Sequence, residues 1–460
     1  MHKPTISQVF SSSLIITILA FVVVLLQVVD VTAGDTWAIN LDDRISFSHI
    51  IFYSTIIIVS VFLQLYFLKT CTRIVFKSKK ANSHSTLIIV YFYIASQLAV
   101  IILLLFLLGE QLVASTYNVV SVQLIVGISL AISILIMVSQ AIKCLKSYLS
   151  RRSKMSGFYA IAIIALSLQM ISAFFYVEAN LDNKPQYITP ERNPWASYYY
   201  TSFNSKLYSL YDITKSISFF AVWIVSLLLT KSYVQKIGKI KYWITVSTPM
   251  AYFLFQYSTL LLNETGMLSS LVMSSGSIFP ILYNFVLNTV NVGTAILFGI
   301  SFFIVSRGLT YEHLKYYLII CGAGIMINFS SSVSTILILS AFPAWGVVSI
   351  SFILPASFLI LMGLDSVTFY VAGDVRIRSY LSRSKGQFEL FRALASTKAT
   401  AEAEHKIKEI IKQIHNNIET DALFTPKSES EDVKQYVGEV LAELKKKSTK
   451  SGNYSDNPTT

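Results

Sequence analysis

Long apolar runs recur through residues 1–371, and short polar segments separate them. The hydrocarbon core of a bilayer is about 30 Å thick, and roughly 20 apolar residues of helix cross it. By this measure the pattern predicts about ten spans in an all-α, polytopic transmembrane helix bundle. The expected spans are residues 9–29, 48–68, 86–108, 119–142, 157–177, 212–230, 242–262, 280–305, 316–340 and 346–370.

Basic residues collect in every second segment between the expected spans. Residues 69–85, 143–156, 231–241 and 306–315 are rich in Lys and Arg, and the intervening segments hold few. Basic loops stay on the cytoplasmic side of a membrane, so both termini are expected in the cytoplasm. These residues also explain the formal net charge of +12, because they face anionic lipid headgroups. The bilayer is the expected partner, and nucleic acid is not.

The first expected span, 9–29, has two interpretations. Leu14 to Val29 is apolar, and Val31-Thr32-Ala33 would suit cleavage by signal peptidase. The run is long for a signal peptide, and Lys3 is the only Lys or Arg before it. A retained helix is therefore favoured, and cleavage would leave the other spans where they are.

Composition agrees with a membrane protein, because 54% of the residues are hydrophobic and 13% are charged. A soluble domain carries about 25% charged residues. The interiors of the expected spans hold almost no ionisable side chain: Asp212 and Lys215 lie at one end of a span, and Asp365 lies near the end of the last. Proton relays in membranes need such side chains. Proton-coupled transport is therefore not expected.

No motif in the chain indicates catalysis. H-E-x-x-H, G-x-S-x-G and P-loop patterns are absent, and the histidines are scattered. The Asp42-Asp43 pair could hold a divalent cation beside a lipid phosphate. Because its loop is short, ordinary external charge is the favoured interpretation. The sequence predicts no enzymatic activity, no catalytic residue, no cofactor and no metal site.

Polar residues lie on matching faces of two expected spans. Asn284, Asn288 and Asn291 are spaced four and three residues apart, so they share one face of span 280–305. An unsatisfied amide in lipid costs several kcal/mol, so this face is expected to contact protein. The next span offers Asn328, Ser331, Ser332 and Thr335 on one side. The favoured interpretation is a hydrogen-bonded interhelical seam, and the alternative is a polar cavity for a ligand or solute.

Two prolines and an aromatic loop add further expectations. Pro249 and Pro355 lie within expected spans, where each removes a main-chain hydrogen bond and permits a kink.

The external segment 178–211 is dense in aromatic residues and forms either part of the aromatic belt or a lid over a ligand pocket. The candidate lid residues are Trp195, Tyr198, Tyr199 and Tyr200.

Residues 372–460 form a second region, a cytoplasmic helical tail of mixed charge. Residues 387–419 are expected to form one helix, and Pro426 interrupts the chain after it. A short coiled-coil seam is predicted there by the 4-3-4 spacing of Ile407, Ile411, Ile414 and Ile418. The chain after about residue 448 is expected to be disordered. This tail is expected to self-associate or to bind a cytoplasmic protein.

These patterns favour a multi-pass protein of the plasma membrane with no enzymatic activity. The first interpretation is a sensor, receptor or assembly subunit that signals through its helical tail. The alternative is a channel or transporter for a neutral or amphipathic solute that is not coupled to protons. The sequence identifies no ligand for either.

Overall fold

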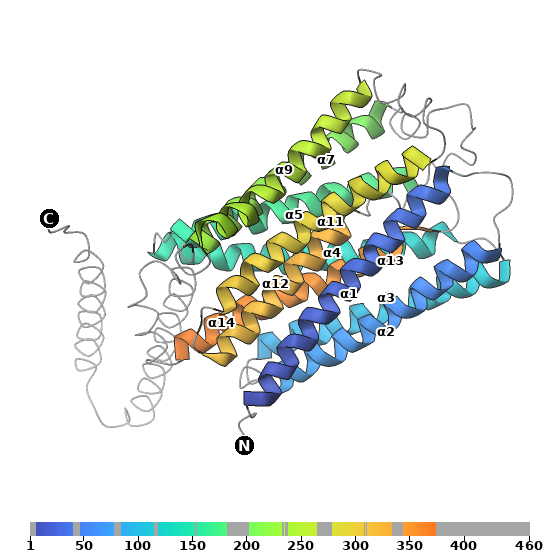
Figure 1. Cartoon of the computed structure of the whole chain (residues 1–460). Helices are drawn as coiled ribbons and strands as arrows, with labels where there is room; N and C mark the ends of the chain where they lie inside the picture. Colours follow the sequence, from blue (N-terminus) through green and yellow to red (C-terminus); the bar gives the residue numbers. More distant parts are fainter. Residues whose placement is uncertain are drawn as a thin grey trace, which may run out of the picture. The chain divides into compact units, whose positions relative to one another are not determined.

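The computed structural model describes residues 6–39, 47–77, 84–114, 118–151, 154–181, 202–231, 234, 238–264, 278–307, 309, 311–333 and 344–373. They lie in a unit of Met1–Lys398, and the second unit, Ala399–Thr460, lies outside the described residues. Every regular element described is a helix (Figure 1). The elements are α1 (Ile6–Ile39), α2 (Phe47–Lys77), α3 (His84–Ala114), α4 (Val119–Arg151), α5 (Lys154–Leu181), α7 (Ser202–Lys231), α9 (Lys239–Glu264), α11 (Ile278–Arg307), α12 (Glu312–Val333), α13 (Val347–Ser351) and α14 (Ile353–Gly373).

Helices α12, α13 and α14 form the centre of the bundle. In the 18-residue apolar window of α12, 83% of the residues are buried, and in the window of the span Val347–Thr368 all of them are. The corresponding fraction is 39% to 44% in α1, α2, α3, α4 and α7. Figure 1 shows α12 and α14 between α1 on one side and α4 with α5 on the other. We call α12, α13 and α14 the central helices.

The outer helices present apolar side chains outward and bury their small or polar ones. In α1, Leu14, Ile18 and Leu25 are each more than half exposed, whereas Ala20 and Gln27 are fully buried. Exposed apolar side chains lie three or four positions apart, so they form one stripe along the helix. This is the reverse of a soluble amphipathic helix, and it suits a helix whose outer face meets lipid.

Glycines let the central helices approach each other and α11 closely. A Cβ atom on Gly324 of α12 would lie 2.8 Å from the Ala356 carbonyl oxygen of α14. A Cβ atom on Gly322, two residues earlier in α12, would lie 2.8 Å from the Cβ atom of Phe302 on α11. No real Cβ atom tolerates such distances. Close approach of small residues is a common means of packing membrane helices.

The last expected span, 346–370, is broken into two helices. α13 ends at Ser351, and α14 begins at Ile353. Pro355 has no N–H to donate to the Ser351 carbonyl, and Phe352 instead donates to the Ser349 carbonyl across 3.2 Å. The loss of a main-chain hydrogen bond expected at Pro355 therefore accompanies an interruption of the regular helix at Phe352.

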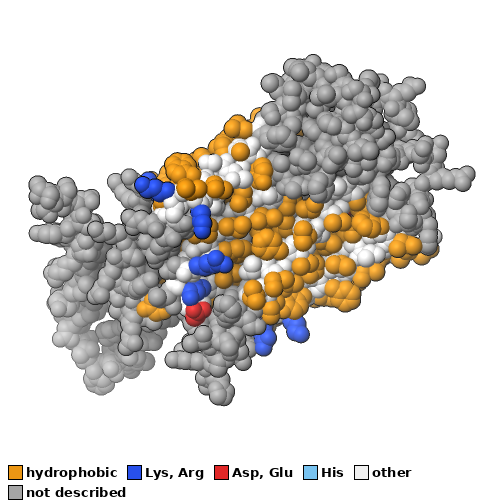
Figure 2. Space-filling view, in the orientation of Figure 1, with side chains coloured by type: hydrophobic (Ala, Val, Ile, Leu, Met, Phe, Trp, Pro, Cys, Tyr) orange, Lys and Arg blue, Asp and Glu red, His pale blue; other side chains and the backbone are white. Residues whose placement is uncertain are grey.

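Exposed basic residues gather at one end of the bundle. They lie at the ends of α2, α4, α7 and α11 and at the start of α9, and Figure 2 shows several of them at one margin of the apolar surface. They are Lys69, Arg73, Lys143, Lys146, Lys231, Lys239, Lys241 and Arg307. We call this the basic end, and we call the opposite end, where α1 and α12 finish and α13 starts, the α13 end.

The all-helical membrane bundle expected from the sequence is confirmed. Among the described residues, eight helices are long and apolar enough to cross a membrane. The side chains of residues 255–291 are outside the described part, which leaves the spans expected at 242–262 and 280–305 as predictions. The described stretch Val292–Arg307 of α11 is apolar but shorter.

Candidate functional site

A buried carboxylate lies at the α13 end of the bundle. Asp30 of α1 is fully buried. Its oxygens accept hydrogen bonds from the Ser349 hydroxyl (2.6 Å), the Ser349 N–H (3.3 Å) and the Gly346 N–H (3.4 Å). The first N–H groups of a helix have no partner within that helix, and a negative charge there is favourable. Asp30 therefore caps the start of α13 from a different helix.

Tyr53 of α2 holds the segment that leads into α13. Its hydroxyl donates to the Ala344 carbonyl across 2.6 Å, and its ring meets Trp345 edge to face at 4.7 Å between centroids. Gly346 follows with φ of 83°, in the left-handed region that glycine adopts without strain. This turn directs the Gly346 N–H at Asp30, so the start of α13 is held by two side chains of other helices, Asp30 and Tyr53.

Buried glutamines of the outer helices reach serines of the central helices. Gln27 of α1 donates to the Ser331 hydroxyl of α12 across 2.7 Å. Gln64 of α2 donates to the Ser351 hydroxyl of α13 across 2.6 Å. Gln97 of α3 donates in turn to the Gln64 carbonyl oxygen across 2.8 Å. Three outer helices are thus joined, directly or through Gln64, to the central ones.

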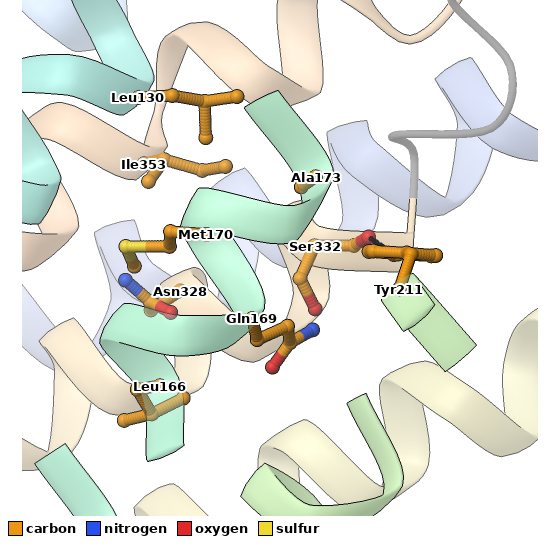
Figure 3. Close-up of a pocket in the computed structure, with 9 residues that line it drawn as sticks. All are labelled: Leu130, Leu166, Gln169, Met170, Ala173, Tyr211, Asn328, Ser332 and Ile353. Atoms are coloured by element: carbon orange, nitrogen blue, oxygen red, sulfur yellow. Dashed lines mark hydrogen bonds between the residues drawn. The ribbon is translucent and has the colours of Figure 1, made fainter. Parts of the chain in front are cut away.

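On the other side of the centre, bonds connect α12 with α14 and α7. The Asn328 amide of α12 donates to the Ser357 hydroxyl of α14 across 3.3 Å. The Tyr211 hydroxyl of α7 donates to the Ser332 carbonyl of α12 across 2.8 Å, and Figure 3 shows this bond. We call the buried hydrogen-bonding residues around the central helices the polar core. They are Gln27, Asp30, Tyr53, Gln64, Gln97, Gln169, Tyr211, Ser218, Asn328, Ser331, Ser349, Ser351 and Ser357, with the half-buried Ser332 beside them.

A small cavity of about 10 Å³ lies within the polar core, between α5, α7 and α12 (Figure 3). Its walls mix apolar and neutral polar side chains, and no charged residue is among them. They are Leu130, Leu166, Gln169, Met170, Ala173, Tyr211, Asn328, Ser332 and Ile353. The Gln169 carbonyl oxygen accepts a bond from Ser218 of α7, while its amide nitrogen has no hydrogen-bond partner among the described residues.

The polar core includes part of the seam expected from the sequence. Asn328 and Ser331 are buried, and Ser332 lies beside the cavity. Their described bonds go to α1, α7 and α14. Asn284, Asn288 and Asn291 lie in α11, but their side chains are outside the described part, as is Thr335. The seam between α11 and α12 therefore stays a prediction.

The other candidate residues lie outside the described part of the chain. This holds for the candidate lid residues Trp195, Tyr198, Tyr199 and Tyr200, and for the tail residues Ile407, Ile411, Ile414 and Ile418. Among the described residues, no three His, Cys, Asp or Glu side chains are grouped so that they could hold a metal ion. Cys71, Cys144 and Cys321 are buried free thiols.

The structure adds ionisable side chains near the ends of the candidate spans, and Asp30 of the first span is one of them. That span was expected to end at residue 29, whereas α1 continues to Ile39 and its candidate span, Leu14–Ala33, includes Asp30. The glutamines were not predicted to take part, because the expected seam consisted of asparagines, serines and a threonine. A signal was present, since each of the first five expected spans contains a glutamine, and amides in spans seek protein partners.

Together, the apolar helices and the enclosed polar core define a multi-pass integral membrane protein with an all-α fold. No protein-family model, curated protein or solved structure matches the chain. Its function must therefore be argued from the arrangement of the polar core.

Proposed function

We propose that the protein is a non-enzymatic membrane sensor or receptor, in which the central helices carry a signal from the α13 end to the tail. One observation carries this proposal: every residue in the apolar window of Val347–Thr368 is buried, and α14 is the last described helix before residues 374–460 in the sequence. A displacement of α13 at one end of the bundle would therefore reach the segment that enters the tail.

Polar contacts at both ends of the α13–α14 segment join it to neighbouring helices, as a conformational switch requires. At the α13 end, Asp30 and Tyr53 of other helices hold its start. At the basic end, Asp365 of α14 forms an ion pair with Lys143 of α4 at 2.8 Å. Both carboxylates bond to different helices, so a change in either contact alters how α13 and α14 sit against their neighbours. Coupling between two sites requires an element with two arrangements, whose equilibrium is shifted by events at either site.

The orientation belongs to the same proposal. The chain crosses the plasma membrane about ten times, with the basic end and both termini in the cytoplasm. The α13 end then faces outward, where a stimulus would act. The tail, with the seam of Ile407, Ile411, Ile414 and Ile418, self-associates or binds a cytoplasmic protein.

Hydrogen exchange of the tail tests this proposal in the full-length protein in lipid nanodiscs. Asp30→Asn weakens the cap of α13, and we expect it to change exchange across residues 387–419. Ser133→Ala is the matched control, because Ser133 is buried and, among the described residues, its hydroxyl bonds to the Ser129 carbonyl of its own helix alone. A folded Asp30→Asn protein whose tail exchanges like the wild type would contradict the proposal.

A channel or transporter for a neutral or amphipathic solute is the second candidate. Polar side chains of α5, α7 and α12 converge on one cavity without a charged group. Its volume of about 10 Å³ admits one water molecule, so passage of a larger neutral solute requires the helices to separate there. The sequence predicted transport without protons because ionisable side chains are rare in the expected spans. The buried Asp30 weakens that argument. Flux of glycerol or urea into proteoliposomes, with and without a proton gradient, tests this candidate. Flux that Gln169→Leu abolishes would favour it over the receptor.

A further inference from the structure

The cavity beside Gln169 combines room and chemistry for one particular ligand. Its volume is about 10 Å³, close to the space that one water molecule needs. The walls offer neutral hydrogen-bonding groups from α5 and α12. With no charged side chain among them, an inorganic ion would lack compensation for its lost hydration.

Gln169 supplies the independent sign that a ligand belongs there. The residue is 3% exposed, and its amide nitrogen has no protein partner in the described part of the chain. Ser218 bonds to the other polar atom of the amide, and this bond is kept in either orientation of the amide, because the Ser218 hydroxyl can donate to the oxygen or accept from the nitrogen. In both orientations one polar atom of Gln169 is left for the cavity. In Figure 3 the amide nitrogen of Gln169 and the hydroxyl of Ser332 point toward one another.

We propose that this cavity is a binding site for a single water molecule that joins Gln169 of α5 to α12. The water accepts from the Gln169 amide and donates to the Ser332 hydroxyl oxygen, with the Asn328 amide as a further neighbour. Buried waters make about three hydrogen bonds to groups that would otherwise be unsatisfied. Tyr211, 1% exposed and stacked on Tyr176 at 5.9 Å, closes the site toward the α13 end.

This water completes the polar core. Ser218 bonds to Gln169, and the water extends that link to α12, whose Ser331 is bonded to Gln27 of α1. A water-mediated bond is nearly as favourable as a direct hydrogen bond, and a buried water is costly to remove. The water therefore forms a stable joint between α5 and the centre of the bundle. The site does not depend on whether the protein is a receptor or a transporter.

X-ray radiolytic labelling of the full-length protein in nanodiscs tests the site. Radiolysis of a bound water oxidises the side chains beside it, even where they are buried. Met170 lines the cavity and is 5% exposed, whereas Met137 and Met326 are fully buried elsewhere. We expect several-fold more oxidation at Met170 than at Met137 and Met326, and no loss of it when a bulk radical scavenger is added.

Two outcomes would overturn the proposal. Equal oxidation of the three methionines would show that no water lies beside Met170, and loss of the Met170 signal with scavenger would show entry of bulk radicals. Ala173→Val fills the cavity and should lower Met170 oxidation to the level of Met137. Ala173→Ser is a smaller change that gives Gln169 a protein hydroxyl, and it should also lower the signal. The wild-type comparison stands even where neither variant folds.

Discussion

The Asp30 carboxylate of α1 and the Ser349 hydroxyl of α13 lie 2.6 Å apart at the α13 end of the bundle, and both residues are fully buried. They are separated by 319 positions in the chain, so this contact ties the first helix to the last membrane segment. Buried carboxylates in membrane helices are costly and occur where they have a specific partner. Here the partner is the start of a helix, whose free N–H groups favour negative charge.

Removing this carboxylate should destabilise the protein more than removing its charge alone. Asp30→Ala leaves the Ser349 and Gly346 donors unpaired and should cost about 3 kcal/mol, because each buried unpaired donor costs about 1–3 kcal/mol. Asp30→Asn keeps one acceptor oxygen and should cost about half as much. Thermal unfolding in detergent micelles measures both. Equal stability of wild type and Asp30→Ala would show that the cap contributes nothing.

The turn before α13 should reject a side chain. Gly346 has φ of 83°, and left-handed backbone costs an L-residue about 1–2 kcal/mol. Gly346→Ala should therefore lower the unfolding free energy by about that amount. Gly109→Ala is the control, since Gly109 is helical and a Cβ atom added to it would have no neighbour within 4 Å. That change should be neutral or slightly stabilising.

The contact between α12 and α14 should be sensitive to a single added methyl group. The Cβ atom introduced by Gly324→Ala would lie 2.8 Å from the Ala356 oxygen, so the helices must separate. Overpacking of this kind costs about 1–3 kcal/mol. Gly127→Ala on α4 should be tolerated, because its nearest neighbour would be Phe174 at 4.0 Å. Unfolding by stepwise addition of a denaturing detergent compares the two, and equal stability would contradict the close approach.

The bond from Gln27 to Ser331 should be individually weak. Interhelical hydrogen bonds in membrane proteins average about 0.6 kcal/mol in double-mutant cycles. The cycle of Gln27→Leu, Ser331→Ala and the double variant should give a coupling energy near this value. A coupling energy indistinguishable from zero would show that the two side chains do not act together.

The membrane helices could be predicted because the requirement for apolar length is strong and local. The existence of the helices over 48–68 or 119–142 follows from composition alone. Their ends could not be placed, because a helix continues past the bilayer wherever its own hydrogen bonds are favourable, and α1 thus extends to Ile39 and includes Asp30. Because the expected span ended at residue 29, the prediction left out the next residue, the buried Asp30.

The partners of the polar residues depended on tertiary structure. The sequence showed that Asn328 and Ser331 share a face of one helix, which the structure retains. It could not show that Ser331 meets Gln27, because 304 positions separate the two residues. Nor could it show which helices are central, since α12 is less apolar than the outer helices and carries several small residues.

The asparagines of α11 can be placed in register with α12, although their side chains lie outside the described residues. Gly322 of α12 faces Phe302 of α11, and the two helices are consecutive and run in opposite directions. About three turns further on, Ser332 should lie opposite Val292. Continuing by helical spacing, positions 291 and 288 are expected on the face that already contains the fully buried Ala295.

A crosslink tests whether this interface continues to the asparagines. Val292→Cys with Ser332→Cys should form a disulfide in native membranes, whereas Ile304→Cys with Ser332→Cys should not, because about 18 Å of helix separates positions 292 and 304.

If the seam exists, replacing one asparagine by Leu should cost about 1 kcal/mol, and replacing all three should cost more than any single change. Failure of the first pair to crosslink, together with ready labelling of Asn288→Cys by a water-soluble thiol reagent, would instead place the asparagines in a wet cavity. The transporter would then be the better supported function, because a solute path needs polar groups that face water rather than one another.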